Sequence, residues 1–507
     1  MVEFKKGDTI HIEGSVDGKI VEELGRGTQG IAYKLMLRDR LYALKWFTSK
    51  GILDNAAFKE NLRKNIEERK SPDSRFLWPL YMTAEQNGAY GYVMDLKPSE
   101  YSKFPAILNC VPSARFPSWD EQIVAALNLV SAFRALHLNG LSYQDMNDGS
   151  FFINVKTGDI KICDTDNVTS GGEANSSGVK GTPGYMAPEI IAKQEHPSTE
   201  TDFHSLAVVL FKLFVHHHPL EGKRLADGDG LADPTVLHGT DPVFIFDPDN
   251  TSNRPTLEEQ ENPRNIWPGL PEYIQNLFIQ AFGEGLKSPT RRPTELEWQK
   301  ALLRFRDEDV VNDTHDAARF LIGDYSIALI AGKELYRYHV EPKADFLNIN
   351  FSSSIGKIVS NKTTGRIALL NNSGEAWMFT APDGTKGKVE TGQVIEVKCG
   401  TELTVNGVIG HLAFQLNTDK YNLTLSPGVK LYAYHTNLNG TDRKTVTGKV
   451  VARKDNPQKW ALLNLSDTTW RFRSAWDEEG EVAKDQVVSL ARGCVINFGD
   501  ISGTIAG

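Results

Sequence analysis

The chain has few cysteines and no long apolar segment. Its four cysteines, Cys110, Cys163, Cys399 and Cys494, are far apart and none has CxxC spacing, which argues against a zinc cluster or a disulfide framework. A reducing cytosol suits such usage, so we expect a cytoplasmic protein. The N-terminal segment MVEFKKGDTIHIEG lacks the apolar core of a signal peptide. The longest apolar run, Leu206–Val215, is too short to span a bilayer, so we expect a buried helix there and no membrane association.

An excess of positive charge is also missing. With 56 Lys and Arg against 65 Asp and Glu, the formal net charge is -9, which argues against nucleic-acid binding as the main activity. The hydrophobic content of 40% and charged content of 24% are ordinary for a soluble globular protein. A chain of 507 residues is too long for one hydrophobic core, so we expect about two to four domains.

A glycine-rich turn interrupts a β-strand pattern near the N-terminus. Residues 20–47 alternate apolar and polar side chains, and Gly25, Gly27 and Gly30 have the spacing GxGxxG. In a dinucleotide-binding fold these glycines would open a helix, but here the strand pattern continues through Ile31 and Tyr33. We therefore expect a hairpin that lies over phosphates; the alternative is a glycine-rich surface turn.

Lys45 lies inside an apolar strand, in the segment YALKWF. A buried ammonium is costly unless it meets an anion, and the phosphates of ATP would be such an anion. The alternative is an edge lysine whose head reaches solvent. The spacing of Lys45 after the glycine turn favours the phosphate-binding interpretation.

Six ordered motifs follow one another over about three hundred residues. They are the glycine turn, YALK, SYQDMNDGSFFI at 142–153, KICDTDN at 161–167, GTPGYMAPE at 181–189, and the pair formed by TDFHSLAVVLFKL and RRPT. Together they resemble the eukaryotic-like protein kinase family. The resemblance implies a bilobal α+β fold, ATP with Mg²⁺ (or Mn²⁺) as cofactors, and protein substrates. GTPGYMAPE resembles the serine/threonine version of the substrate loop.

The resemblance also implies site residues. Asp145 would orient and deprotonate the substrate hydroxyl, while Lys45 would hold the phosphates of ATP. Asp164 and Ser150 would bind magnesium, with Ser150 standing where the family has asparagine. Around the adenine we expect Ala43, Met94, Asp95 and Leu96.

Four further residues are expected to hold the fold. Asp202 would open a central buried helix, and Arg292 would pair with Glu189. A carboxylate on the following helix should pair with Lys45. The apolar stripe of that helix, Phe58, Leu62 and Ile66, puts Asn65 at the position of this carboxylate. Glu68, one turn later, is then the expected partner.

Departures from the family pattern bear on activity. Gln144 replaces the arginine before the catalytic aspartate, so a phosphate on the following loop would lack its usual clamp. Thr169, Ser170, Ser176 and Ser177 are the modifiable residues of that loop. Asp166 would add a second carboxylate near the metal. A nucleotide-binding pseudokinase scaffold is the alternative function, in contrast to an active serine/threonine kinase.

A narrower resemblance concerns partners. QDMNDGSFFI, CDTDN, HPLEGKR and PVFIFDPDNTSNRP resemble one bacterial branch of the kinase family. Its members resemble the kinase of gene triads that also encode a PPM-type phosphatase and a von Willebrand factor A protein, associated with tellurite resistance and stress. That likeness implies these two partners by analogy.

The second half of the chain is β-prone and repeats itself. IALLNNSGEAW at 367–377 matches WALLNLSDTTW at 460–470, and LYRYH at 335–339 matches LYAYH at 431–435. We expect two tandem all-β, sandwich-like modules for protein contact, with Trp377 and Trp470 as core anchors. They faintly resemble forkhead-associated domains.

The expected organisation is a kinase-like domain followed by the two modules. The kinase-like domain is placed at 1–308, with an N-lobe at 1–96 and a C-lobe at 97–308. A linker at 309–322 precedes the first repeat at 323–417 and the second at 418–507.

Overall fold

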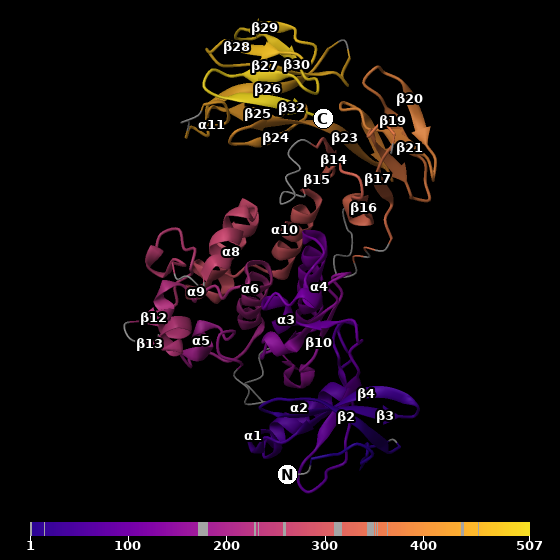
Figure 1. Ribbon diagram of the computed structural model, residues 1–507, viewed down its shortest axis with the longest axis vertical. Helices are drawn as coiled ribbons and strands as arrows, with labels where there is room; N and C mark the ends of the chain where they lie inside the picture. The colour runs from indigo at the N-terminus through magenta and orange to yellow at the C-terminus, as the bar shows by residue number, and fades with distance from the viewer. Residues whose placement is uncertain are drawn as a thin grey trace. The chain divides into compact units, whose positions relative to one another are not determined.

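The computed structural model divides the chain into two compact units, Met1–Leu303 and Arg304–Gly507, called here the N-terminal and C-terminal units (Figure 1). It describes the whole chain apart from residues 1–2, 15, 171–180, 228–229, 232, 257–259, 309–316, 342–348, 350, 352, 362, 438–440 and 455. Ser176 and Ser177, and most of the expected linker, lie outside the described residues. The predicted fold class is confirmed: an α+β kinase-like region is followed by a region made mostly of β-sheets.

The N-terminal unit begins with an antiparallel six-stranded sheet. Its order is β1 (Thr9–Ile10), β2 (Gly18–Arg26), β3 (Gly30–Leu37), β4 (Arg40–Phe47), β6 (Gly91–Asp95) and β5 (Pro79–Met82). Alternating side chains of β3 and β4 are buried, among them Tyr33, Leu44 and Trp46, which belong to one apolar core. This alternation is the period expected of strands with a buried face.

Helix α2 (Ala56–Glu67) follows the sheet strands β1 to β4 in the chain. Asn55 caps its N-terminus by accepting a hydrogen bond from the backbone N–H of Phe58. The predicted stripe is buried at Phe58 and Leu62, but Asn61 and Asn65 are buried on the helix as well. The inner face of α2 therefore carries two amides.

The rest of the N-terminal unit is mainly helical. The long helices are α4 (Trp119–Leu138), α6 (Thr199–Val215), α8 (Glu272–Phe282) and α10 (Glu295–Glu308), of which α10 belongs to this unit only as far as Leu303. The shorter elements are α1 (Lys50–Leu53), β7 (Ser102–Lys103), α3 (Phe104–Leu108), β8 (Leu141–Ser142), β9 (Phe151–Ile153), β10 (Ile160–Ile162), β11 (Thr169–Ser170), α5 (Pro188–Ile191), β12 (Ala226–Asp227), β13 (Gly230–Leu231), α7 (Glu261–Ile266) and α9 (Glu284–Lys287). A capping box of Ser198 and Thr201 starts α6, whose segment Leu206–Val215 is the predicted buried helix. No helix among the described residues is long and apolar enough to cross a bilayer.

The C-terminal unit consists of an eleven-stranded sheet and two four-stranded sheets. One small sheet has the order β16 (Glu334–Leu335), β17 (Gly356–Ser360), β18 (Ile367–Asn371) and β21 (Val394–Glu396). The other has the order β25 (Lys430–Tyr432), β26 (Val446–Ala452), β27 (Trp460–Asn464) and β30 (Val487–Ser489). The matched segments of the sequence thus occupy corresponding strands, β18 and β27.

One long strand serves both halves of the C-terminal unit. The eleven-stranded sheet contains β14 (Arg319–Ile322), β15 (Tyr325–Ala328), β19 (Trp377–Thr380), β20 (Lys386–Val389), β22 (Glu402–Val405), β23 (Val408–Thr418), β24 (Asn422–Leu425), β28 (Trp470–Arg473), β29 (Glu479–Val482), β31 (Val495–Asn497) and β32 (Ser502–Ala506). The first half of β23 pairs with β22 and β14, and its second half pairs with β24 and β32. The division expected between 417 and 418 therefore lies inside a strand.

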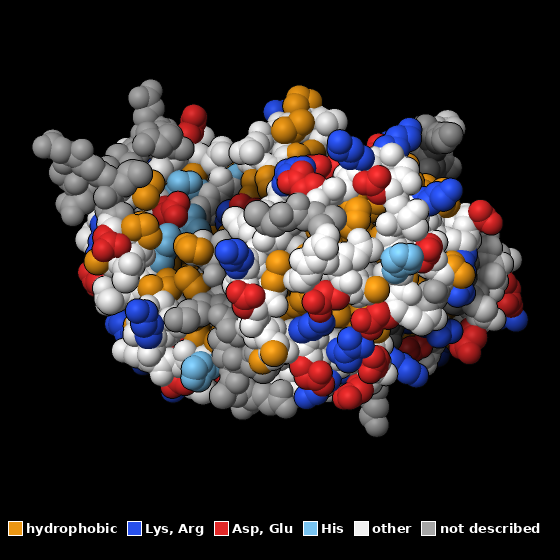
Figure 2. Space-filling view, turned by 90° about the horizontal axis from the view of Figure 1, so that it is seen from below, with side chains coloured by type: hydrophobic (Ala, Val, Ile, Leu, Met, Phe, Trp, Pro, Cys, Tyr) orange, Lys and Arg blue, Asp and Glu red, His pale blue; other side chains and the backbone are white. Residues whose placement is uncertain are grey.

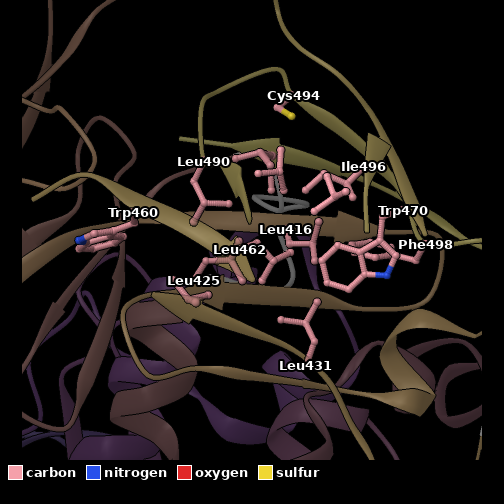
Figure 3. Packing of buried hydrophobic residues seen from close by; sticks show 14 of the residues in the cluster. Leu416, Leu425, Leu431, Trp460, Leu462, Trp470, Leu490, Cys494, Ile496 and Phe498 are labelled. Carbon is pink, nitrogen blue, oxygen red and sulfur yellow. The ribbon is translucent and has the colours of Figure 1, made fainter. Parts of the chain in front are cut away.

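Each half of the C-terminal unit has its own apolar core. Trp377 and Leu412 belong to the first core, whereas Leu416 and Trp470 belong to the second. Figure 3 shows Trp470 packed with Phe498, Ile496 and Leu416 in the second core. Both tryptophans are fully buried. Strand β23 thus contributes to both cores: Leu412 belongs to the first core, and Leu416, four residues later, belongs to the second.

Candidate active site

Lys45 is held by acidic side chains rather than left at an edge. Strand β4 carries it with only 11% of its side chain exposed, and Nζ lies 2.9 Å from Oδ1 of Asp164 and 3.0 Å from Oδ2 of Asp166. It also donates to Oε1 of Gln29 at 3.0 Å. Burial by itself lowers the pKa of Lys45, but attraction by Asp164 and then Asp166 raises that pKa above its usual value. Lys45 is therefore a buried cation.

Asp166 is buried more deeply than Asp164, the other carboxylate that binds Lys45. Its side chain has 0% exposure and accepts hydrogen bonds from Lys45 and, at 2.9 Å, from the hydroxyl of Tyr92 on β6. Asp164 has a left-handed backbone with φ 55°, and the short 3-10 turn Thr165–Asn167 follows it. The oxygens of Asp166 face Lys45 and Tyr92, and its expected place as a carboxylate near the metal stays a prediction.

Helix α2 is fastened to the segment after Asp164 by amides. Nδ2 of Asn61 and Nδ2 of Asn65 both donate to the carbonyl of Val168, at 2.9 and 3.0 Å. Arg69 donates to Oδ1 of both asparagines, at 2.9 and 2.7 Å, and to Oγ of Ser170 at 2.9 Å. This network fixes the helix without a carboxylate on its inner face.

Glu68 is not the partner of Lys45. It is the C-cap residue of α2, it is exposed, and the carboxylates that bind Lys45 come from Asp164 and Asp166. The physical reason is the register of α2. The buried stripe turns Asn61 and Asn65 inward, and the helix ends before another inward position is reached.

The loop around Asp145 is held by Asp202 at the start of α6. The carboxylate of Asp202 accepts the backbone N–H groups of Tyr143 at 2.6 Å and Gln144 at 3.0 Å. Gln144 has φ 73°, so these bonds hold a left-handed backbone next to Asp145. Oδ1 of Asp145 accepts the hydroxyl of Thr182 at 2.6 Å. Burial raises the pKa of Asp145, although the bond from Thr182 opposes the rise.

His137 is clamped between two acidic side chains behind that loop. Its Nε2 lies 3.0 Å from Oδ2 of Asp202, and its Nδ1 forms a short hydrogen bond with Glu295. Burial lowers the pKa of His137, but the bonds to Asp202 and Glu295 outweigh burial and raise it to about 9. The imidazolium thus neutralises Asp202, which positions the loop of Asp145.

We expect this clamp to make the N-terminal unit less stable at alkaline pH. A pKa of about 9 when folded, against 6.5 for free histidine, means that the stabilisation is complete below pH 6.5 and disappears as pH rises through about 9. The expected loss is roughly 3 kcal/mol. Chemical unfolding at several pH values measures it. His137→Gln should flatten the dependence of the free energy of unfolding on pH, whereas exposed His11→Gln should leave it unchanged. The same pH dependence in wild type and in His137→Gln would contradict the assignment.

Ser150 and Asp164 are neighbours at the expected metal position. The carbonyl of Ser150 accepts the backbone N–H of Cys163 at 2.9 Å, which brings Ser150 beside the residue that precedes Asp164. The hydroxyl of Ser150 is buried and has no hydrogen-bond partner among the described residues. Asp164 keeps 30% of its side chain exposed. A carboxylate with a buried, unused hydroxyl fits a hard divalent cation such as magnesium.

The glycines of the β2–β3 turn serve two purposes. A Cβ on Gly30 would fall 2.1 Å from the carbonyl oxygen of Trp46, so only glycine packs there. A Cβ on Gly25 or Gly27 would meet no atom within 4 Å, so space is open beside both residues. Phosphates need such open backbone.

The expected adenine contacts lie on facing strands. Ala43 on β4 pairs with Met94 on β6, and both are nearly buried in one apolar cluster against which Leu96 packs. The side chain of Asp95 instead forms a surface ion pair with Arg40 at 2.8 Å. The carboxylate of Asp95 is thus engaged at the surface, and the expected contacts with adenine stay predictions.

Arg292 and Glu189 form a buried ion pair. Both guanidinium nitrogens bind the carboxylate, at 2.7 and 2.8 Å, and Arg292 also donates to the carbonyls of Gly285 and Glu200. The side chain of Arg292 has 0% exposure. Two parallel bonds with planar geometry are the strong form of such a pair.

A cavity of about 390 Å³ opens beside Asp145. Its lining comes from three segments of the chain: Asn147, Asp148, Gly149, Thr182, Pro183, Gly184, Tyr185, Lys212, His218 and Glu221. Lys212 binds Oδ2 of Asp148 at 2.9 Å and forms a short hydrogen bond with the hydroxyl of Tyr185. Thr182, one of the lining residues, donates its hydroxyl to Asp145, so the cavity lies next to Asp145.

Residues 19–236 match the family model of the protein kinase domain. The chain is 27% identical over 211 residues to the serine/threonine-protein kinase TIO of Arabidopsis thaliana, an alignment that covers 41% of the chain and 15% of the relative. It is 26% identical over 211 residues to the serine/threonine-protein kinase sck2 of Schizosaccharomyces pombe, covering 40% and 31%. The chain therefore spans under a third of the length of these curated relatives.

A solved structure is also similar to part of this chain. It is the PknI kinase domain of Mycobacterium tuberculosis, in a double-mutant form, with 16% identity and a TM-score of 0.41. The alignment covers 60% of this chain and 100% of that chain.

Sequence reasoning missed the pairing of Asp166 with Lys45 and the amide network of α2. Two signals for them exist. The inner face of the helix at 56–67 lacks an acid, and CDTDN has one carboxylate more than a magnesium ligand requires. Because α2 offers no inward carboxylate to Lys45, another acid must pair with this lysine. Asp166 is the acid of CDTDN that is not needed as the magnesium ligand.

Proposed function

We propose that this protein is an ATP-dependent and magnesium-dependent protein kinase that transfers the γ-phosphate to serine or threonine of protein substrates. The observation that carries the proposal is the constellation of Asp145, bonded to Thr182, with the ion pair of Lys45 and Asp164. A base, a phosphate-binding cation and a metal-binding carboxylate are what phosphoryl transfer requires. The match of residues 19–236 to the protein kinase domain and the serine/threonine kinases among the relatives support it.

Each residue has one task in the proposed reaction. Asp145 accepts the proton of the substrate hydroxyl, and its raised pKa makes it a stronger base than an exposed carboxylate. Lys45 holds the phosphates of ATP in place. Magnesium, when bound by Asp164 and Ser150, neutralises charge on the phosphates. Asp166 keeps Lys45 oriented, so that Asp164 would be available to hold magnesium.

Thr182 supports serine or threonine as the acceptor. Its hydroxyl donates to Asp145 and so occupies the space on one side of the base. A short aliphatic hydroxyl reaches Asp145 beside Thr182, whereas the hydroxyl of tyrosine extends farther from its own backbone. Tyrosine is therefore the less favoured acceptor.

Phosphate transfer from radiolabelled ATP to the protein itself and to a generic protein substrate tests the proposal. Asp145→Asn should reduce transfer at least about a hundredfold, because it removes the base without changing the size of the side chain. Exposed Asp159→Asn is the matched control and should keep wild-type transfer. Equal transfer by Asp145→Asn and wild type would refute the assignment of the base.

The second candidate function is a nucleotide-binding pseudokinase scaffold. Ser150, where the family has asparagine, and the missing acid on the inner face of α2 favour it. ATP binding without transfer, measured with magnesium and with manganese, would select this function.

The described cysteines are all free, and we propose a cytoplasmic location on that support.

The C-terminal unit is proposed to bind other proteins. Its two β-rich halves offer no constellation like that of Asp145 and Lys45 among the described residues. A PPM-type phosphatase and a von Willebrand factor A protein are the proposed partners, supported by the motif resemblance. Removal of the label from the phosphorylated chain by such a phosphatase, and co-purification with the von Willebrand factor A protein, are the tests.

A further inference from the structure

Two histidines and a glutamate converge on one side of the cavity near Thr182. Nε2 of His238 lies 3.2 Å from Oε1 of Glu221, and Nδ1 of His218 lies 3.9 Å from the same oxygen. The three atoms that could bind a metal all lie within 4.8 Å of one another. Figure 2 shows histidine side chains gathered at the left of the face it presents. These three residues are called the His-Glu cluster.

His238 has ring nitrogens that the protein itself does not use. The residue is only 6% exposed, and neither Nδ1 nor Nε2 has a hydrogen-bond partner among the described residues. Although Nε2 is close to Glu221, it is not aligned for a hydrogen bond to it. A buried imidazole without hydrogen bonds loses its hydration without compensation. A ligand between His238 and Glu221 would supply that compensation.

His218 has the tautomer that a metal ligand needs. Its Nε2 lies 2.6 Å from the carbonyl oxygen of Gly184, which can only accept, so Nε2 carries the proton. Nδ1 therefore presents its lone pair on the side of Glu221. The backbone N–H of Leu220 donates to that lone pair at 3.1 Å, and a cation would replace this bond. Such a hydrogen bond from the outer nitrogen to a carbonyl is typical of metal-bound histidine.

The charge states agree with this geometry. Burial lowers the pKa of His218 to about 4, so its imidazole is neutral near pH 7. Neutral imidazole and ionised carboxylate are the forms that bind metal ions.

Two rigid segments hold the His-Glu cluster. His218 and Glu221 follow α6, and the side chain of Asn253 accepts the backbone N–H of Gly222 at 3.2 Å just beyond them. His238 lies in a single π-helical turn, Val236–Thr240, where a Cβ on Gly239 would fall 2.5 Å from Ile191 of α5. Close packing of this kind keeps the donor atoms in place without a ligand.

We propose that the His-Glu cluster is a binding site for a divalent transition-metal ion, with zinc as the best fit. Two imidazoles and one carboxylate are a donor set of zinc sites that keep a fourth position open. Here that position faces the cavity, because His218 and Glu221 line it. Magnesium and calcium prefer oxygen donors throughout, so they suit this site poorly.

The site would act on the substrate segment through one hydrogen bond. A cation on Nδ1 of His218 makes Nε2–H a stronger donor to Gly184, which stands two residues after Thr182. Bound metal therefore fixes the segment at 181–189, which contacts Asp145 through Thr182. This effect on substrate binding rests on the proposed kinase function, whereas metal binding itself does not.

Metal binding to the full chain tests the site without any activity measurement. The protein is stripped with a chelator and dialysed, then titrated with Zn²⁺ and, separately, with Co²⁺, whose visible absorption reports four-coordinate nitrogen and oxygen ligands. We expect one equivalent of tightly bound zinc, and a Tm of the N-terminal unit that rises when zinc is added. His238→Ala and Glu221→Gln should each weaken zinc binding at least tenfold.

Matched variants separate this site from other histidines and from folding defects. Exposed His11→Ala makes the same substitution outside the cluster and should bind zinc as the wild type does. Glu221→Gln keeps the size of the side chain, so it covers the case in which His238→Ala fails to fold. No zinc above background in the wild type, or equal zinc in wild type and Glu221→Gln, would overturn the proposal. Zinc binding without phosphate transfer would instead retain the site and remove the kinase function.

Discussion

Asp166→Asn should lower kcat/KM for phosphate transfer by about a hundredfold or more. The amide keeps the shape of the side chain and can still accept the hydroxyl of Tyr92, but it leaves Lys45 with Asp164 as its one carboxylate. Asp164 is then drawn toward Lys45 and away from magnesium. The loss of a fixed charge beside the transferring phosphate has effects of this size. Steady-state kinetics with varied ATP measure it.

The control for Asp166→Asn must separate a loss of orientation from a loss of fold. Asp159→Asn makes the same chemical change on an exposed turn and should leave kcat/KM unchanged. Unfolding curves show whether Asp166→Asn still folds, and a higher KM for ATP in a folded variant identifies a disturbed Lys45. Transfer within twofold of wild type would mean that Asp164 alone orients Lys45.

Arg292→Met should destabilise the N-terminal unit by about 3–5 kcal/mol. The substitution leaves Glu189 as a buried carboxylate without its cation, which is the costly outcome for a buried ion pair. It also leaves the carbonyls of Gly285 and Glu200 without their donor. Denaturant unfolding followed by fluorescence measures the loss.

A second substitution tests whether the lost stability of Arg292→Met comes from the unpaired charge of Glu189. In Arg292→Met combined with Glu189→Gln, no buried charge remains, so the double variant should recover part of the stability. Arg40→Met, which removes an arginine paired with Asp95 on the surface of the N-terminal unit, is the matched control and should cost under about 1 kcal/mol. A double variant less stable than Arg292→Met would show that hydrogen bonds to carbonyls dominate.

The order of the motifs predicted much of the fold and of the site. The apolar run Leu206–Val215 predicts the buried part of α6, and the motifs predict which segments carry Asp145, Asp164 and Lys45. Such features depend on local pattern. The alternation of residues 20–47 predicts the strands for the same reason.

The partner of Lys45 could not be predicted in the same way. It depends on the left-handed turn at Asp164 and on the side chain rotamer of Asp166, which sequence spacing does not determine. The apolar stripe places Asn65 on the inner face of the helix, but it does not show that Asn61 and Asn65 are held there by hydrogen bonds to the carbonyl of Val168. A buried amide with satisfied bonds looks the same in a sequence as an exposed one.

The strand shared by the two halves of the C-terminal unit has a consequence for the order in which that unit folds during synthesis. β14, at residues 319–322, must wait for its partner at residues 410–413 of β23. The other end of β23 must then wait for β32, whose last paired residue is Ala506. The first half can thus close once β23 has been made, whereas the second half closes only when β32 is complete. Until then the second half of β23 lacks β32 and exposes an unpaired strand edge, which is prone to association with other chains.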